Sequence, residues 1–113
     1  MIQIIHNPRC AKSRAGLQFL KEKNIPFQEI RYLDHPLTKE EIKTILKKLG
    51  IKPIEWVRKK EEIYKTQFKG NALSDEAWVD ALAKFPKLME RPVVINGDKA
   101  VIARPASLIE EIL

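Results

Sequence analysis

The chain of 113 residues predicts a single α/β domain that begins β-α-β and ends β-β-α, with a largely helical block in between. Three observations support this fold class. A β-branched apolar run, Ile2, Ile4 and Ile5, opens the chain and is typical of a buried strand. Apolar residues then recur at helical spacing over several segments. Near the end, Asn96-Gly97-Asp98 separates two short apolar runs, which is a hairpin signal.

The first section is predicted to contain two strands joined by a helix. His6-Asn7-Pro8 ends the opening strand, because proline cannot donate to a ladder and Asn-Pro favours a turn. A helical pattern follows Cys10 and stops at Lys23-Asn24, just before a proline. The run from Phe27 to Leu33 is compatible with a second strand and precedes a turn.

The middle of the chain predicts helices. Thr38 and Glu41 form the pattern of a capping box, and the apolar positions that follow repeat at helical spacing until Gly50. Ser74 is a suitable cap for a further helix. We interpret this part, about residues 38–90, as a helical insertion in the domain.

The last section predicts a hairpin and a closing helix. Arg91-Pro92 introduces an apolar strand over 93–95, and residues 100–102 return as its partner. Ala106 to Leu113 has the composition of a closing helix. No internal repeat or low-complexity tract is present in the sequence.

The charge balance favours a small anionic substrate over nucleic acid. The net charge is +6 and the pI is near 9.5. Much of the excess is lysine interleaved with glutamate in helical segments, which is typical of a solvated face. The sequence has no zinc-finger spacing, no RNA-binding aromatic signature and no basic tail, and no motif for a metal or a nucleotide.

The composition also bears on the compartment. No apolar run approaches the roughly 20 residues that a membrane helix requires, and the N-terminal stretch lacks the pattern of a signal peptide. The single cysteine cannot form an internal disulfide and agrees with a reducing compartment. We therefore expect a cytoplasmic protein without membrane partners.

Cys10 is the candidate nucleophile. It is the only cysteine and lies where a predicted strand ends and a helix begins. A free thiol has a pKa of roughly 8.5, and a helix N-terminus lowers it by favouring the thiolate. Arg9, Lys12 and Arg14 add positive charge, so we predict a lowered pKa for Cys10 and a place for a tetrahedral oxyanion beside it. The alternative is that Cys10 is a small buried hydrophobic residue.

Several motifs resemble one enzyme family. His6-Asn7-Pro8-Arg9-Cys10-Ala11-Lys12-Ser13-Arg14 resembles the active-site loop, approximately HNPxCxxSR, of the glutaredoxin-linked arsenate reductases. Arg91-Pro92-Val93-Val94 and Arg104-Pro105 resemble two downstream arginine motifs of that family, and Trp56-Val57-Arg58-Lys59 falls where the family carries another arginine. The resemblance covers essentially the whole chain. It implies a thioredoxin-like fold with a helical insertion and a cis peptide bond at Pro92.

The resemblance also implies a mechanism. Cys10 would attack arsenate, or a similar oxyanion, that is held by three arginines, Arg58, Arg91 and Arg104. Glutathione would then attack the adduct as a co-substrate, glutaredoxin would collect the electrons, and arsenite would be released; no bound cofactor is implied. The residues agree with an external thiol, because Ser13 occupies the place of the second cysteine of a Cys-x-x-Cys loop.

Other site residues have more than one interpretation. His6 could stabilise the thiolate as an imidazolium, or it could be a loop histidine bonded to backbone. Ser13 could hydrogen-bond the thiolate or simply begin the helix, and Arg58 could be part of a basic surface run. The remaining residues that we expect to support the site are Asn7, Arg14 and Pro92.

Two other functions fit the same outline. The Spx-type transcription regulators are similar in fold and length and bind RNA polymerase, but their redox switch uses a Cys-x-x-Cys pair that Ser13 removes here. A glutathione-dependent thiol reductase without arsenate activity is the third hypothesis, because a fold alone does not fix a substrate.

Overall fold

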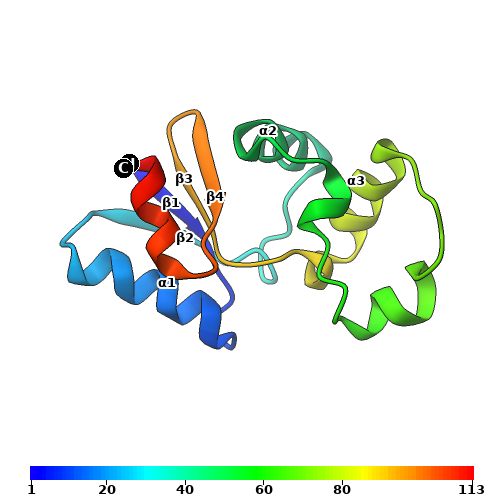
Figure 1. Ribbon diagram of the computed structural model, residues 1–113, viewed down its shortest axis with the longest axis horizontal. Helices are drawn as coiled ribbons and strands as arrows, with labels where there is room; N and C mark the ends of the chain where they lie inside the picture. Colours follow the sequence, from blue (N-terminus) through cyan, green and yellow to red (C-terminus); the bar gives the residue numbers. More distant parts are fainter. The chain divides into compact units, whose positions relative to one another are not determined.

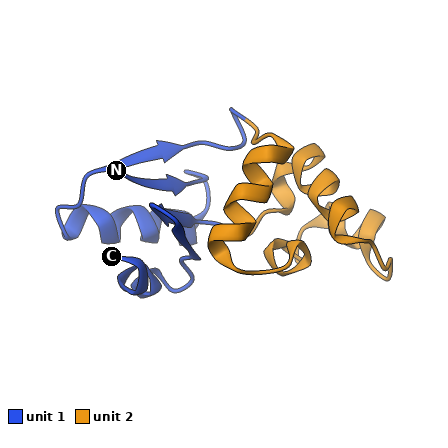
Figure 2. Ribbon diagram, turned by 90° about the horizontal axis from the view of Figure 1, so that it is seen from above, with its two compact units in different colours: residues 1–35, 91–113 blue, residues 36–90 orange.

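The computed structural model describes residues 1–113, which divide into two compact units. The first unit contains residues 1–35 and 91–113, and the second contains residues 36–90 (Figure 2). The second unit is therefore a continuous insertion between two parts of the first. No helix in residues 1–113 is long and apolar enough to cross a membrane.

The first unit is built on a four-stranded mixed sheet with the order β2-β1-β3-β4 (Figure 1). β1 (Ile2–Ile5) runs parallel to β2 (Phe27–Ile30) and antiparallel to β3 (Val93–Asn96). β4 (Lys99–Ile102) pairs with β3 as a hairpin. The order β-α-β followed by β-β-helix is confirmed, although the second strand ends at Ile30, earlier than the sequence predicts.

Two helices pack on the sheet of the first unit. α1 (Ala11–Glu22) connects the strands β1 and β2. Parallel strands need such a crossover connection, because the chain must return to the same edge of the sheet. The closing helix η4 (Ala106–Ile112) is a 3₁₀-helix and contacts both α1 and β4. The core between these elements is apolar and contains Ile2, Ile4, Leu20, Val94, Ala103, Ile109 and Ile112.

The hairpin forms as the Asn-Gly signal predicts. Gly97 has φ 64°, a left-handed conformation that glycine adopts without a steric penalty. The side chain of Asn96 donates to the carbonyl of Ile112 at 2.6 Å and so ties the hairpin to η4.

The second unit is helical, and both predicted caps are present. The Thr38 hydroxyl accepts from the backbone N–H of Glu41 at 3.2 Å, and the Glu41 carboxylate accepts from the backbone N–H of Thr38 at 2.9 Å. The Ser74 hydroxyl accepts from the N–H of Ala77 at 3.2 Å. The helical elements are α2 (Lys39–Leu49), η1 (Pro53–Trp56), η2 (Tyr64–Phe68), α3 (Asp75–Lys84) and η3 (Pro86–Leu88).

Aromatic side chains organise the interior of the second unit. Trp56 is fully buried, and its indole N–H donates to the carbonyl of Glu90 at 2.9 Å. Trp78 is nearly buried and lies 6.4 Å from the ring of Tyr64 and 5.5 Å from the ring of Phe68. Tyr64 and Phe68 lie in a π-helical turn, η2, that the sequence did not reveal.

A close contact fixes α1 against the start of β3. The Arg91-Pro92 peptide bond is cis, as expected, and so is the Arg104-Pro105 bond, which was not expected. A Cβ atom placed on Gly16 would lie 2.8 Å from Cγ of Pro92 and 3.5 Å from Cδ1 of Ile4. Only a residue without a side chain fits between α1 and this proline.

We predict that Gly16→Ala destabilises the protein by about 1 kcal/mol. Alanine favours a helix over glycine by about 1 kcal/mol, but forcing a methyl group into a packed site costs roughly 1–3 kcal/mol, and the ring of Pro92 has little freedom to move. Urea unfolding measures the difference. Ala15→Gly, at the exposed neighbouring position, is the matched control for helix propensity. A more stable Gly16→Ala protein would show that the contact imposes no constraint.

Candidate active site

The loop from Asn7 to Cys10 is closed by its own hydrogen bonds. The N–H of Cys10 donates to the carbonyl of Asn7 at 2.9 Å, and the N–H of Arg9 donates to the Asn7 side-chain oxygen at 3.0 Å. This is an Asx-type turn, which asparagine favours for this reason. Cys10 is the residue just before α1, with extended backbone angles (φ −96°, ψ 124°).

Two side chains of α1 hold the loop from the other side. The fully buried Ser13 hydroxyl accepts from the N–H of Asn7 at 3.1 Å. The Arg14 guanidinium donates to the carbonyl of Pro8 at 3.0 Å. Ser13 and Arg14 therefore fix the geometry of the loop. For the Ser13 hydroxyl this differs from both interpretations that the sequence offered, a hydrogen bond to the thiolate and a plain helix start.

The pKa of Cys10 lies below its ordinary value, as predicted. Burial is the largest single cause and would raise the pKa, but the causes that lower it outweigh burial together, and the largest of them is a hydrogen bond from the backbone of Ser13. The next largest causes are a hydrogen bond from the Arg91 side chain, one from the backbone of Lys12, and the charge of Arg91. The first turn of α1 and one buried arginine thus stabilise the thiolate.

The hydrogen bonds from the start of α1 are those expected of a helix N-terminus, but the cation that acts on Cys10 differs from the expectation. We predicted that Arg9, Lys12 and Arg14 would act through their charges, whereas the main cation is Arg91, which is 7% exposed. Arg14 instead binds the loop carbonyl. Cys10 is only half-buried, so the interpretation of it as a small core residue is wrong.

His6 is buried and neutral near pH 7. Burial is the main cause that lowers the pKa of His6, and the positive charge of Arg31 adds to it, against opposing effects from Glu29 and from the backbone of Ser13. The protein environment therefore disfavours an imidazolium at neutral pH, and it favours the interpretation of His6 as a loop histidine bonded to backbone.

The register of the hairpin brings Arg91 and Arg104 to the same end of two neighbouring strands. Val93 pairs with Ile102, so positions 91 and 104 face each other when the ladder is extended by two residues. The N–H of Ala103 donates to the carbonyl of Pro92 at 2.9 Å, which continues this pairing. The Arg104 residue is half-buried.

Arg58 belongs to the second unit. Its backbone N–H donates to the carbonyl of Leu88 at 2.6 Å, next to an isolated bridge between Val57 and Met89. Its guanidinium lies 3.6 Å from the carboxylate of Glu61, and the side chain is 25% exposed. Arg58 is thus anchored and paired within the helical unit.

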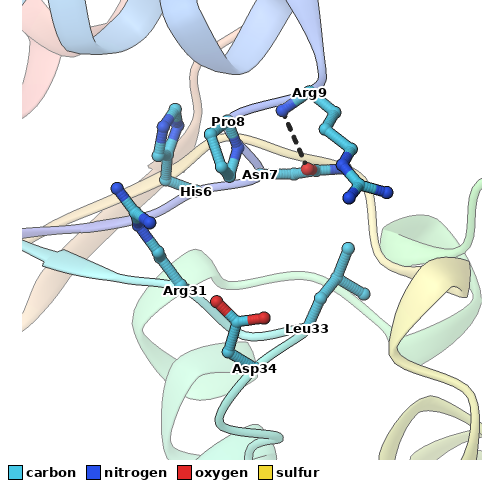
Figure 3. Close-up of a pocket in the computed structure, with 7 residues that line it drawn as sticks. All are labelled: His6, Asn7, Pro8, Arg9, Arg31, Leu33 and Asp34. Atoms are coloured by element: carbon cyan, nitrogen blue, oxygen red, sulfur yellow. Dashed lines mark hydrogen bonds between the residues drawn. The ribbon is translucent and has the colours of Figure 1, made fainter.

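A pocket of about 290 Å³ lies beside the cysteine loop (Figure 3). One side comes from the loop after β1 and the other from the segment after β2. The sequence assigned no role to the second side, because it placed Arg31 and Leu33 inside the second strand, which in the structure ends at Ile30. The lining residues are His6, Asn7, Pro8, Arg9, Arg31, Leu33 and Asp34.

The residues that could hold a metal ion do not gather in this structure. Residues 1–113 contain no group of three or more His, Cys, Asp or Glu side chains placed to ligate one.

Comparison with known proteins identifies the family. The sequence model of the ArsC family matches residues 5–112. The chain belongs to the ArsC family. It is 41% identical to an arsenate reductase of Neisseria meningitidis, with 99% of this chain and 97% of that protein aligned. It is 43% identical to an arsenate reductase of Haemophilus influenzae, with 97% of each covered.

A solved structure confirms the fold of this ArsC-family chain. The arsenate reductase from Vibrio cholerae superposes with a TM-score of 0.94 at 40% identity, covering 99% of this chain and 97% of that one. The thioredoxin-like fold that the motifs implied is therefore correct.

We predict that Arg91 sets the pKa of Cys10. The rate of alkylation by iodoacetamide, an uncharged reagent, should be measured against pH. Its midpoint should lie at a lower pH than for a free cysteine, because only the thiolate reacts and it persists to lower pH. Arg91→Gln should move the midpoint up toward the ordinary value, and Arg91→Lys should move it less, since the charge remains while the planar fork is lost.

Arg9→Gln is the matched control for this experiment. It removes an equal charge next to Cys10 in the sequence, but Arg9 is exposed and is not among the main causes of the shift. Circular dichroism checks that each variant is folded. A larger change with Arg9→Gln than with Arg91→Gln would assign the stabilisation to the exposed loop charges instead.

Proposed function

We propose that this ArsC-family protein is an arsenate reductase in which the Cys10 thiolate is the nucleophile. The observation that carries the proposal is the contact of the Cys10 sulfur with Arg91 and with the first turn of α1. Groups that stabilise a thiolate also stabilise an oxyanion placed beside it. The named activities of the relatives at about 40% identity support the same substrate.

The first step would join Cys10 to arsenic. The sulfur attacks the arsenic of bound arsenate, one arsenic–oxygen bond breaks, and the oxygen leaves as water after taking up a proton. Arg91 and Arg104 start from the same end of the β3–β4 hairpin and would hold the remaining oxygens. Arg58 would supply the third guanidinium, because its present partner, Glu61, is an exchangeable ion pair at 3.6 Å.

External thiols would complete the reaction. Because Cys10 is the only cysteine, no internal disulfide can supply the two electrons that arsenic needs. Glutathione would bond to the arsenic of the adduct with loss of an oxygen as water, and a thiol of glutaredoxin would attack the glutathione sulfur and leave the electron pair on arsenic. Water would then cleave the bond between Cys10 and arsenic, which releases arsenite and restores the thiol. Overall, arsenate and two thiols give arsenite, one disulfide and water, so atoms and electrons balance.

We predict arsenate-dependent oxidation of NADPH in a coupled assay with glutathione, glutaredoxin and glutathione reductase. Cys10→Ser should lose this activity to the background rate, because a hydroxyl is not ionised near pH 7 and forms no comparable adduct. Omitting glutaredoxin should slow the turnover.

The control distinguishes a missing substrate from a missing nucleophile. If the native protein shows no arsenate turnover while Cys10 still alkylates rapidly at neutral pH, the arsenate assignment fails. Turnover of a glutathione mixed disulfide under the same conditions would then assign a general thiol reductase.

We predict that Arg104→Ala and Arg58→Ala each raise the KM for arsenate. The loss of one charge-assisted hydrogen bond costs about 1.5–3 kcal/mol, which corresponds to roughly 10- to 100-fold. Lys99→Ala, on the exposed start of β4, and Lys87→Ala, in the second unit, are the matched controls and should change the KM less than twofold. An unchanged KM in Arg58→Ala would leave that arginine with a purely structural role beside Glu61.

A further inference from the structure

The pocket beside the cysteine loop has no part in binding the oxyanion as described above. Its upper side is the segment from His6 to Arg9, and its lower side is formed by Arg31, Leu33 and Asp34 (Figure 3). A volume of about 290 Å³ suits a small peptide-sized ligand, near the lower end of the range for ligand sites.

The charges in the pocket have a defined arrangement. Arg31 and Arg9 flank it at opposite ends, and the Asp34 carboxylate lies between them in the view of Figure 3. Leu33, which is 37% exposed, and Pro8 add apolar surface. The lining therefore offers two cations, one anion and an apolar patch to a ligand.

His6 borders the pocket, but its ring points away from Arg31, Leu33 and Asp34 (Figure 3). His6 is 2% exposed, and its Nδ1 has no hydrogen-bond partner within the protein. Because Nδ1 is buried, a ligand in the pocket would be recognised by the charged side chains of the lining and not by His6.

Arg31 retains the capacity to bind an anion. Its ion pair with Glu29 is long at 3.6 Å, and the Arg31 side chain is 53% exposed. A guanidinium has five N–H donors, so it can bind a ligand carboxylate without leaving Glu29.

We propose that this pocket binds the external thiol co-substrate, a tripeptide thiol of the glutathione class. The inference rests on the proposed function and names the site of its second substrate. At neutral pH such a peptide carries a carboxylate at each end and one ammonium group. The two arginines match the carboxylates, Asp34 matches the ammonium, and Leu33 and Pro8 face the methylene groups.

The location suits delivery of the thiol to Cys10. Arg9 precedes Cys10 directly, so their Cα atoms are about 3.8 Å apart. A peptide held between Arg9 and Arg31 carries its thiol in the middle of its length, next to the loop that ends at Cys10. The thiol sulfur bonds to the arsenic of the Cys10 adduct, and its proton leaves with an arsenic oxygen as water.

Binding can be measured without any turnover. We use S-methylglutathione, which has no free thiol, and titrate it into the Cys10→Ser protein by calorimetry or NMR. Arg31→Gln should weaken the binding at least tenfold, and Asp34→Asn should weaken it several-fold. Lys21→Gln, an exposed cation on α1 outside the pocket, is the matched control and should leave the affinity unchanged.

Kinetics then separate this inference from the proposed function. In the coupled assay, Arg31→Gln should raise the KM for glutathione at least tenfold and leave the KM for arsenate unchanged. If arsenate is reduced but neither the KM for glutathione nor the binding of S-methylglutathione responds to Arg31→Gln and Asp34→Asn, the pocket assignment is wrong and the proposed function stands.

The opposite result is equally informative. If arsenate is not reduced but S-methylglutathione binds and Arg31→Gln weakens it, the pocket assignment stands while the substrate assignment fails. Absence of any binding of S-methylglutathione at millimolar concentration would overturn the pocket assignment directly.

Discussion

The charge on the Cys10 sulfur is balanced by the backbone N–H groups at the start of α1 and by the guanidinium of Arg91. These groups come from two parts of the chain that are far apart in sequence. Both must be held firmly, because hydrogen bonds to an anion weaken steeply when their geometry is lost. Much of the first unit can be understood from this requirement.

Three features keep the two parts in place. The Ser13 hydroxyl binds the N–H of Asn7, so the loop cannot move away from the helix. Gly16 allows α1 to approach Pro92, the residue that follows Arg91. The antiparallel pairing of β1 with β3 sets the start of β3 beside the end of β1. The catalytic loop is therefore supported by a sheet register and by a helix contact, not by loop interactions alone.

Local signals in the sequence predicted most of the fold. The capping box at Thr38, the Asn-Gly turn at residues 96–97 and the β-branched run of β1 each depend on near neighbours, and all three are present. The lowered pKa of Cys10 was also predictable in direction. The contribution of the helix N-terminus was predicted as well, but that of Arg91 was not, because its approach to the sulfur depends on strand pairing that no local pattern encodes.

The same reasoning explains what the sequence could not reveal. The pocket exists only because two strands, β1 and β2, end side by side, and Arg31 and Asp34 have no motif of their own. The π-helical turn is stabilised by the contacts of the Tyr64 and Phe68 rings with Trp78, and Trp78 follows them in the sequence only after a loop. Arg58 was found through a resemblance, and its pairing with Glu61 appeared only in the structure.

A lowered pKa has consequences at both ends of the proposed reaction. It provides thiolate for the attack on arsenic, and it makes Cys10 a better leaving group when the adduct is resolved, since low-pKa thiols leave faster. A protein with one cysteine depends on the second effect as much as on the first, because the bond between Cys10 and arsenic must break before arsenite is released. A separate pocket for that thiol would allow Arg91 to remain on the sulfur through both steps, while Arg31 and Arg9 hold the charges of the peptide. Arg91 would then serve the oxyanion at the sulfur, and Arg31 and Arg9 would serve the peptide in the pocket. With separate cations for each, two anionic substrates can meet at one sulfur atom.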